Sequence, residues 1–277
     1  MYLTIINDGD SQSIARAASR LGSLFNSSVT TFNVGKFADL SLAGNLIDII
    51  DSYEDREGII IANSAPRHDL AKKWENGTPF GYFRYKNLII SSTIDGNCLS
   101  LVKKLKLVSK IKVTDIKKVL NWAKEENEIS DDMLINRIIK SQYRSFDYQP
   151  RLVKWIYDYG DVPNVELEIK DVIDLEPSIY WIDNYGNCKT TVLPEEFDFK
   201  PGEMVLTNFG ELKCYNRMKD VPNREEALVI GSSGIDNKRF VEIISQGESA
   251  SEKLGINIGD QIIFKKIINN QKNKNEQ

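Results

Sequence analysis

The stretch from Trp181 to Thr191, WIDNYGNCKTT, brings an acid, an aromatic ring, an amide and hydroxyl groups close together in the chain. Asp183 and Asn187 flank Tyr185, so their polar groups could hydrogen-bond a flat heterocycle that stacks on the tyrosine ring. The letters DNYGN are also typical of a turn between two strands, SIYWI and CKTTV. A ligand-binding role and a β-hairpin are compatible at this position.

Asp8 follows the apolar, β-branched stretch YLTIIN and precedes turn-forming residues. An acid at the carboxyl end of a parallel strand can accept both hydroxyls of a ribose. The letters DGDS are equally typical of a turn or a helix N-cap. Considered alone, Asp8 fits the turn or cap better.

The loop NSAPRHD, at 63–69, contains Arg67 and the single histidine of the chain, His68. Loops that follow strands often carry catalytic residues, and this pair could transfer a proton or stabilise an anion. A solvated histidine at a helix start explains the loop as well. One histidine rules out any multi-histidine metal centre, and we expect no metal site.

Two segments near the C-terminus combine glycine and serine: GSSG, which includes Ser233, and QGESAS, which includes Ser249 and Ala250. Their N–H and hydroxyl groups could bind a polar ligand, although a hairpin followed by a short helix explains them more simply. The chain contains neither G-x-x-x-x-G-K-[ST] nor G-x-G-x-x-G. These segments therefore differ from the common phosphate-binding loops.

The composition limits the classes of partner. The 277 residues include 36 basic and 40 acidic side chains, a net charge of -4, which gives no general attraction to nucleic acid or to anionic membranes. No apolar stretch is long enough to span a bilayer, and the N-terminus turns acidic too soon for a signal peptide. The three separated cysteines suit a reducing compartment. We expect a cytoplasmic protein that binds neither nucleic acid nor membrane.

The elements that would position these residues divide into two patterns. In the N-terminal part, strand-like and helix-like stretches alternate: strands at 2–8, 28–34, 56–64 and within 85–105, helices at 11–25 and 42–53, and a helix-rich segment at 114–159. Such alternation predicts an α/β domain, residues 1–160, with a mostly parallel sheet. We place the boundary in the polar stretch DYGDVPNVE, at 158–166.

The C-terminal part has short apolar stretches separated by Gly, Pro and Asn, which predicts a smaller all-β, barrel-like domain over residues 165–268. The tail at 269–277 lacks apolar residues, so we expect it to be disordered.

Taken in order, these segments resemble the S-adenosyl-L-methionine (SAM) hydroxide adenosyltransferase family, which is related to the fluorinases and chlorinases. The resemblance covers most of residues 1–264. In the N-terminal part it rests on Asp8, on TTFNVGKFADLSLAGNLI and on Asp95-Gly96-Asn97 followed by LSLV. It is strongest in the C-terminal part, at Asp183, Tyr185, Gly186, Asn187, Thr190, Ser233, Glu242, Ile243, Gln246, Gly247 and Ala250.

The resemblance implies an α/β domain and a β-barrel domain, with SAM as the substrate or ligand and no separate cofactor. It also implies a homotrimer that binds SAM between subunits. By resemblance, Asp8 would hold the ribose hydroxyls and Asp183 the methionine ammonium. The remaining substrate-binding residues would be Tyr185, Asn187, Ser233, Ser249 and Ala250, with the backbone of the last two at the adenine edge.

The sequence departs from the family at two loops. The family's hydrolases carry an Asp-Pro-Gly-x-Gly-Thr loop with a following Arg, and a later Phe-His-Gly-Arg-Asp loop. Here the first loop is ANSAPR, in which Asn63 takes the place of the aspartate and Arg67 remains. The later loop, QYRSFDYQP at 142–150, keeps Asp147 but has no histidine, and His68 stands in the other loop. We therefore assign the catalytic positions of a divergent member to Arg67 and Asn63.

Three functions follow as hypotheses. The first is a hydrolase that cleaves SAM with water to adenosine and L-methionine. The second is a catalytically silent sensor or complex subunit that binds SAM or adenosine. The loops that would orient water are altered in this chain, whereas the binding residues are kept. The third is an interaction protein that keeps only the fold.

Overall fold

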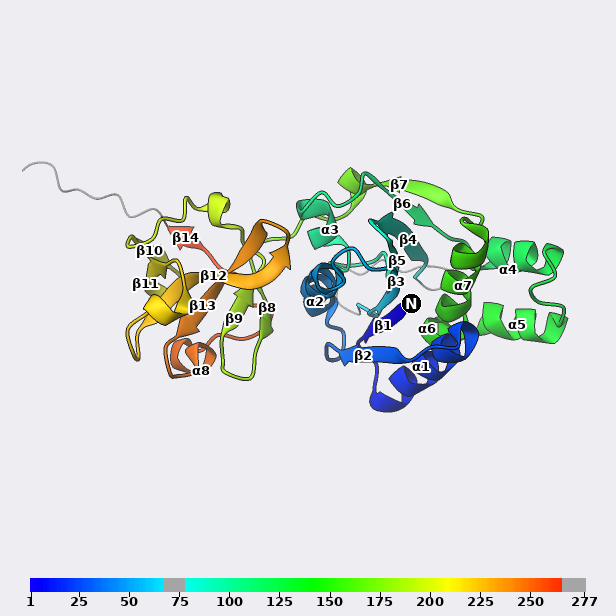
Figure 1. The fold of residues 1–277 in the computed structure, drawn as a ribbon, viewed down its shortest axis with the longest axis horizontal. Helices are drawn as coiled ribbons and strands as arrows, with labels where there is room; N and C mark the ends of the chain where they lie inside the picture. The colour runs from blue at the N-terminus through cyan, green and yellow to red at the C-terminus, as the bar shows by residue number, and fades with distance from the viewer. Residues whose placement is uncertain (67–77, 266–277) are drawn as a thin grey trace, which may run out of the picture. The chain divides into compact units, whose positions relative to one another are not determined.

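The computed structural model describes residues 1–66 and 78–265, which form a first compact unit ending at Leu175 and a second beginning at Glu176 (Figure 1). Arg67, His68 and the tail at 269–277 lie outside the described residues. The division falls later in the chain than the polar stretch at 158–166, because strand β7 (Val165–Glu168) pairs with β6 (Lys110–Val113) and so belongs to the first sheet.

The first unit is built on a seven-stranded sheet in the order β2-β1-β3-β5-β4-β6-β7. Its parallel part consists of β2 (Val29–Asn33), β1 (Tyr2–Asn7), β3 (Gly58–Asn63) and β5 (Leu88–Thr93). Strands β1, β3 and β5 are buried along almost their whole length. Layers of helices on both faces explain these continuous apolar stretches.

The sheet is mixed, so the prediction of a mostly parallel sheet needs correction. Strand β4 (Phe80–Tyr85) pairs antiparallel with both β5 and β6, and β6 pairs antiparallel with β7. Only Lys86 and Asn87 connect β4 to β5, and Lys86 adopts a φ of 51°. A turn this short can join only antiparallel strands, because a parallel pair needs a long crossover.

Helices cover both faces of this sheet (Figure 1). One layer contains α2 (Asp39–Ser52) and α3 (Ser100–Lys104), which pack on each other. The opposite layer contains α1 (Ser11–Phe25), α4 (Ile116–Glu125), α5 (Asp132–Lys140), α6 (Arg144–Asp147) and α7 (Gln149–Tyr159). A short 3-10 helix, Ile169–Asp171, follows β7. The apolar sides of α1, α4, α5 and α7 share one core with β1 and β3.

The second unit contains a mixed seven-stranded sheet in the order β14-β10-β11-β12-β13-β9-β8. Its pairs are antiparallel except for β11 with β12. The strands are β8 (Ile179–Ile182), β9 (Cys188–Thr190), β10 (Met204–Thr207), β11 (Gly210–Tyr215), β12 (Glu226–Ile235), β13 (Lys238–Ser245) and β14 (Phe264–Lys265). Helix α8 (Ala250–Leu254) and the 3-10 helices Pro194–Glu196 and Met218–Asp220 complete the unit.

The barrel-like character of this sheet comes from a link between its two edge strands. The segment before β14 exchanges backbone hydrogen bonds with the residues around the start of β8: Ile179 N–H donates to Asp260 O at 2.9 Å, and Ile262 N–H donates to Pro177 O at 2.9 Å. The segment thus connects the β8 edge to the β14 edge. The closure is partial, since it depends on irregular backbone and an isolated Ser178–Gln261 bridge.

Among residues 1–66 and 78–265, no helix has both the length and the apolar character that crossing a bilayer requires.

Candidate functional site

The first unit has a ligand-binding position defined by its strand order. β1 lies between β2 and β3, so the chain leaves β1 in one direction and later returns on its other side. Helix α1 follows β1 and α2 precedes β3, and these two helices belong to opposite layers. At such a switch point the loops separate at the carboxyl ends of the strands and leave room for a ligand. Asp8 and Asn63 stand at the carboxyl ends of β1 and β3.

Asp8 holds the loop that follows β3. Its Oδ2 accepts hydrogen bonds from Ser64 Oγ at 3.1 Å and from Ala65 N–H at 2.8 Å. The N-cap of α1 is Asp10, whose carboxylate accepts from Ser13 N–H at 2.7 Å. The structure therefore separates the two roles that the sequence left open: Asp10 caps the helix, and Asp8 faces the neighbouring strand end.

Asn63 is connected to the next strand along the sheet. Thr93 Oγ1 donates to Asn63 Oδ1 at 3.4 Å and accepts from Ser64 N–H at 3.3 Å. Asp8, Asn63 and Thr93 thus come from the ends of three adjacent strands, β1, β3 and β5, and form one polar network. Ser64 and Thr93 were not singled out from the sequence. Ser64 directly follows the buried strand β3 and Thr93 ends the buried strand β5, and such positions could have indicated them.

Two buried acids lie behind this network. Asp39 accepts from Asn97 N–H at 2.7 Å, and a Cβ on Gly96 would lie 2.3 Å from the Asp39 carboxylate. Gly96 also has a φ of 60°, so glycine is required there both by the turn and by this contact. Asp95 and Asp39 are both almost fully buried. The Asp-Gly-Asn turn therefore anchors α2 beside the candidate site.

Cys98 is buried beside these carboxylates. Burial raises the pKa of its thiol well above the ordinary value, and the charges of Asp39, Asp8 and Asp95 raise it further. A thiol with a raised pKa stays protonated at neutral pH and is a poor nucleophile. Cys98 is therefore a packing residue.

In the second unit, Asp183 organises the β8–β9 turn. Its Oδ1 accepts from Tyr185 N–H at 2.8 Å and from Asn187 N–H at 3.0 Å, and its Oδ2 accepts from Asn187 Nδ2 at 2.9 Å. Gly186 adopts a φ of 80°, which glycine tolerates best. The hairpin is confirmed. The carboxylate keeps acceptor capacity on Oδ2 for a further donor, because an ionised carboxylate has about four lone-pair sites.

This turn meets the start of α8. Ser251 N–H donates to Gly186 O at 3.0 Å. Ser249 is the N-cap of α8, since its Oγ accepts from Glu252 N–H at 3.2 Å, and Ala250 is fully buried behind it. The structure thus unites two segments that the sequence singled out separately, the DNYGN turn and QGESAS.

Tyr185 and Ser233, which were also predicted to bind the substrate, lie in different surroundings from Asp183, Asn187 and Ser249. The Tyr185 side chain is 80% exposed at the tip of the turn. Ser233 is buried in the irregular part of β12, beside the Gly234–Arg239 pair, whereas β9 pairs with β13 at Ile243. At a rise of ~3.3 Å per residue, Arg239 and Ile243 are roughly 13 Å apart along β13. Ser233 therefore does not join the cluster of Asp183, Asn187 and Ser249.

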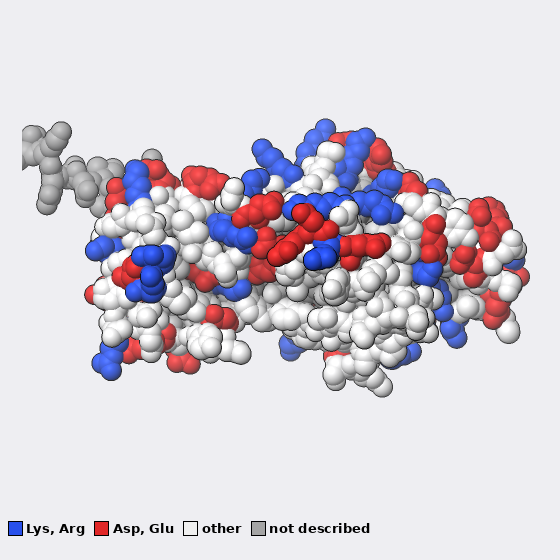
Figure 2. Space-filling model, in the orientation of Figure 1, with Lys and Arg blue, Asp and Glu red and all other residues white. Residues whose placement is uncertain are grey.

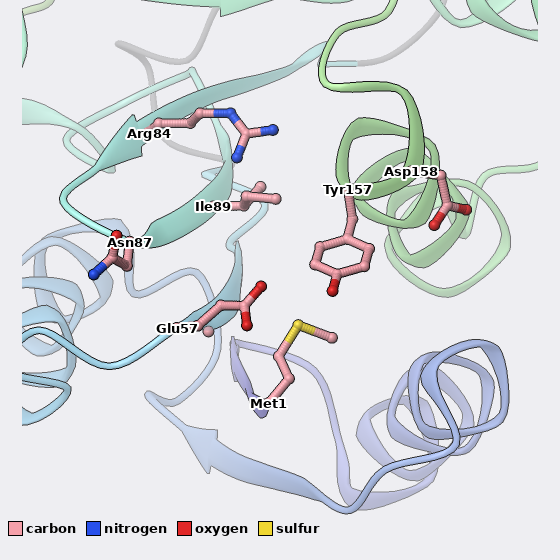
Figure 3. Close-up of a pocket in the computed structure, with 8 residues that line it drawn as sticks. Met1, Glu57, Arg84, Asn87, Ile89, Tyr157 and Asp158 are labelled. Carbon is pink, nitrogen blue, oxygen red and sulfur yellow. The ribbon is translucent and has the colours of Figure 1, made fainter.

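A cavity of about 470 Å³ opens at the opposite, amino-terminal edge of the first sheet (Figure 3). Its lining includes Met1, Glu57, Arg84 and Tyr157. The Arg84 guanidinium already donates to Ile156 O at 3.1 Å and to Gly160 O at 3.2 Å, so it ties β4 to the end of α7. Of the predicted site residues that the structure describes, none borders this cavity.

Among the described ranges, no group of three or more His, Cys, Asp or Glu side chains is arranged to hold a metal ion.

Comparison with known proteins bears mainly on the second unit. Residues 177–263 match the family model of the SAM hydroxide adenosyltransferase C-terminal domain. No curated protein matches the chain. An uncharacterized conserved protein from Thermotoga maritima is similar in structure, with a TM-score of 0.65 and 13% identity, over 95% of this chain and 99% of that one.

A conserved hypothetical protein from Thermus thermophilus is similar too, with a TM-score of 0.60 and 13% identity, over 95% of this chain and 100% of that one. At this identity the similarity shows the fold alone. The chain thus shares its fold with two solved proteins over 95% of its length, and its residues 177–263 match the family model of the SAM hydroxide adenosyltransferase C-terminal domain.

Proposed function

We propose that the protein is a divergent SAM hydrolase, which cleaves SAM with water to adenosine and L-methionine. The observation that carries the proposal is the contact between the β8–β9 turn and the start of α8, at Gly186 and Ser251, inside the domain that matches the SAM hydroxide adenosyltransferase model. This contact unites the acid and amide of the turn with the capping hydroxyl and backbone of the helix start.

The methionine end of SAM would bind at Asp183. An ammonium group needs a carboxylate whose geometry is already fixed, and Asp183 is held by three hydrogen bonds from its own turn. Asn187 and the backbone around Ser249 and Ala250 would supply polar contacts to the adenine. The exposed ring of Tyr185 provides an apolar surface that a ligand could cover.

The ribose end would bind at Asp8. Both hydrogen bonds that Asp8 accepts from described residues are formed by Oδ2, with Ser64 and Ala65 as the donors. A carboxylate fixed through one oxygen can present the other to the two ribose hydroxyls. As the resemblance implies, we propose that SAM binds between two subunits of a homotrimer.

In the proposed reaction, a water oxygen forms a bond to the ribose carbon next to sulfur as the carbon–sulfur bond breaks. The sulfonium takes the bonding electron pair and becomes the neutral thioether of methionine, so the leaving group needs no proton. The attacking water releases its proton to solvent. Asn63, whose Oδ1 is oriented by Thr93, and Arg67 would position the water. A general base typically contributes ~10²- to 10⁴-fold, so turnover without the family's Asp and His should be slow.

The test is to incubate the purified protein with SAM and to quantify adenosine and methionine by chromatography, with SAM binding measured by calorimetry on the same sample. Asp183→Asn and Asp8→Asn should weaken binding at least tenfold. Glu203→Gln, at an exposed position of the second unit, is the matched control and should bind like the wild type. Tight binding without products would instead support the sensor, and no binding at all would leave the interaction protein.

A further inference from the structure

Strand β2 forms one edge of the first sheet. It pairs with β1 on one side, and no strand among the described residues pairs with its other side. Val34 N–H donates to Asn7 O at 3.1 Å. Phe32 and Thr30, which lie two and four residues before Val34, therefore also point their backbone N–H and C=O groups toward β1. Because successive residues alternate in direction, Val29, Thr31 and Asn33 point their backbone N–H and C=O groups away from β1.

This edge lacks the features that usually prevent strands from pairing with other molecules. Natural edge strands carry Lys, Pro or a bulge, or are covered. The strand reads VTTFN, and residues 21–35 contain no charged side chain and no proline. Its register with β1 is continuous from Val29 to Asn33, without a bulge. The β2 edge is therefore a regular template for one more strand.

The surface beside this edge is also uncharged. A groove of about 730 Å³ lies between β2 and α1, and all of its lining residues are uncharged: Ser11, Ile14, Ala15, Ala18, Ser19, Val29, Thr31 and Asn33. The two cations of α1 are used elsewhere. Arg16 stands 3.7 Å above the ring of Phe146, and Arg20 forms an ion pair with Asp147 at 2.6 Å. Figure 2 shows the area over β1 and β2 almost free of charge, while acids and bases crowd the upper part of the same unit.

We propose that the β2 edge binds the β2 edge of a second copy of this chain. The two strands would run antiparallel about a two-fold axis at Thr31, so that Val29 of one copy faces Asn33 of the other. A two-fold contact must be self-complementary, since each residue near the axis meets its own counterpart. A charged edge would meet its own charge, whereas this uncharged edge meets none. The register also pairs Thr30 with Phe32, a β-branched residue with an aromatic one, which is favourable in sheets.

The α1 helices of the two copies would flank the new strand pair. Small side chains at Ser11, Ala15, Ala18 and Ser19 form one side of α1 beside the groove. Small residues let two helices approach closely without clashes. The contact is independent of SAM cleavage, since it uses the edge of the sheet and not the residues assigned to SAM. If the protein is also a trimer, the contact would join two trimers.

The first test introduces a cysteine on the axis. In an antiparallel, hydrogen-bonded pair the Cα atoms are ~5.5 Å apart, a distance that a disulfide spans. Thr31→Cys should therefore form a covalent dimer under mild oxidation, seen on a non-reducing denaturing gel. Ser28→Cys, equally exposed but far from its own counterpart in this register, is the matched control and should stay monomeric on the gel. The three native cysteines are buried and should not interfere.

The second test changes the backbone of the edge. Thr31→Pro removes an outward N–H group, which an edge strand tolerates, while Thr31→Val keeps it. Light scattering should give a dimer, or a pair of trimers, for the wild type and for Thr31→Val, and half that mass for Thr31→Pro. Circular dichroism checks that the proline variant is folded, and if it is not, the cysteine test decides. A monomer or a single trimer for the wild type, an unchanged mass for Thr31→Pro, or equal cross-linking of both cysteine variants would overturn the proposal.

Discussion

Gly186 and Ser249 are in such close contact that a Cβ added to Gly186 would lie 2.0 Å from Ser249 Oγ and 2.7 Å from its Cα. The first residue belongs to the β8–β9 turn and the second caps α8. This contact aligns the two segments that we assign to the methionine and adenine parts of SAM.

Gly186→Ala should therefore lower the free energy of unfolding more than a Gly→Ala change at a turn without such a contact. We expect a destabilisation of about 2–5 kcal/mol, because the methyl group adds overlap to an unfavourable φ. Gly202 has a similar φ of 89° but nothing within 4 Å of the added Cβ, so Gly202→Ala is the matched control and should cost about 1–2 kcal/mol. Urea unfolding of both variants measures the difference. Equal costs would show that Ser249 yields easily and that the contact is unimportant.

Asp183 should have two separable roles. Asp183→Ala removes the acceptor of three hydrogen bonds and should lower the free energy of unfolding by about 1–3 kcal/mol. Asp183→Asn keeps an acceptor oxygen for the backbone N–H groups but has no charge for an ammonium. It loses only the hydrogen bond from Asn187 Nδ2, so it should be more stable than Asp183→Ala and should still bind SAM at least tenfold more weakly than the wild type. Binding that survives Asp183→Asn would remove Asp183 from the proposed site.

The neighbouring acids Asp8 and Asp10 should respond differently to the same change. Asp10→Ala removes the N-cap of α1 and should cost about 1 kcal/mol of stability, with SAM affinity unchanged. Asp8→Ala should weaken SAM binding. Calorimetry and thermal unfolding on the two variants separate the effects, and a loss of SAM affinity in Asp10→Ala but not in Asp8→Ala would reverse our assignment.

The three cysteines should be unreactive in the folded protein. Burial raises the pKa of Cys188 to about 12 and that of Cys214 to about 11, and it also raises the pKa of Cys98 well above its ordinary value. A thiol reagent at pH 8 should label none of them before denaturation and all of them afterwards. Fast labelling of the native protein at any of the three would contradict this assignment.

The same cysteines predict a pH dependence of stability. In the unfolded chain a thiol ionises near its ordinary pKa of ~8.5, while the folded thiols remain protonated to higher pH. The folded state therefore binds more protons above that pH, and stability falls as pH rises from about 8 toward the folded values. The midpoint of urea unfolding should be lower at pH 10 than at pH 8 in the wild type, and the difference between the two pH values should be smaller in Cys188→Ala. An identical decrease in both proteins would assign the effect to other groups.

The sequence by itself determined the local elements of the first unit. Alternating apolar strands and amphipathic helices marked β1, α1, β2, α2 and β3, because each carries its own periodicity and its own turn residues. It did not reveal β4. The short connection at Lys86 and Asn87 reverses the chain and makes half of the sheet antiparallel, and a strand buried in a mixed sheet has the same composition as one in a parallel sheet.

The sequence also identified most of the polar positions, but only the tertiary structure decided their roles. Asp8 and Asp10 are both aspartates in the same turn-forming stretch. In the folded chain, Asp8 bonds to Ser64 and Asp10 caps a helix. Ser233 matched the same pattern as Asp183, yet the register of β12 on β13 places it apart. Residue types and short-range spacing fix turns and caps, whereas contacts such as Gly186 with Ser249 depend on which strands become neighbours, and that depends on the packing of the complete sheet.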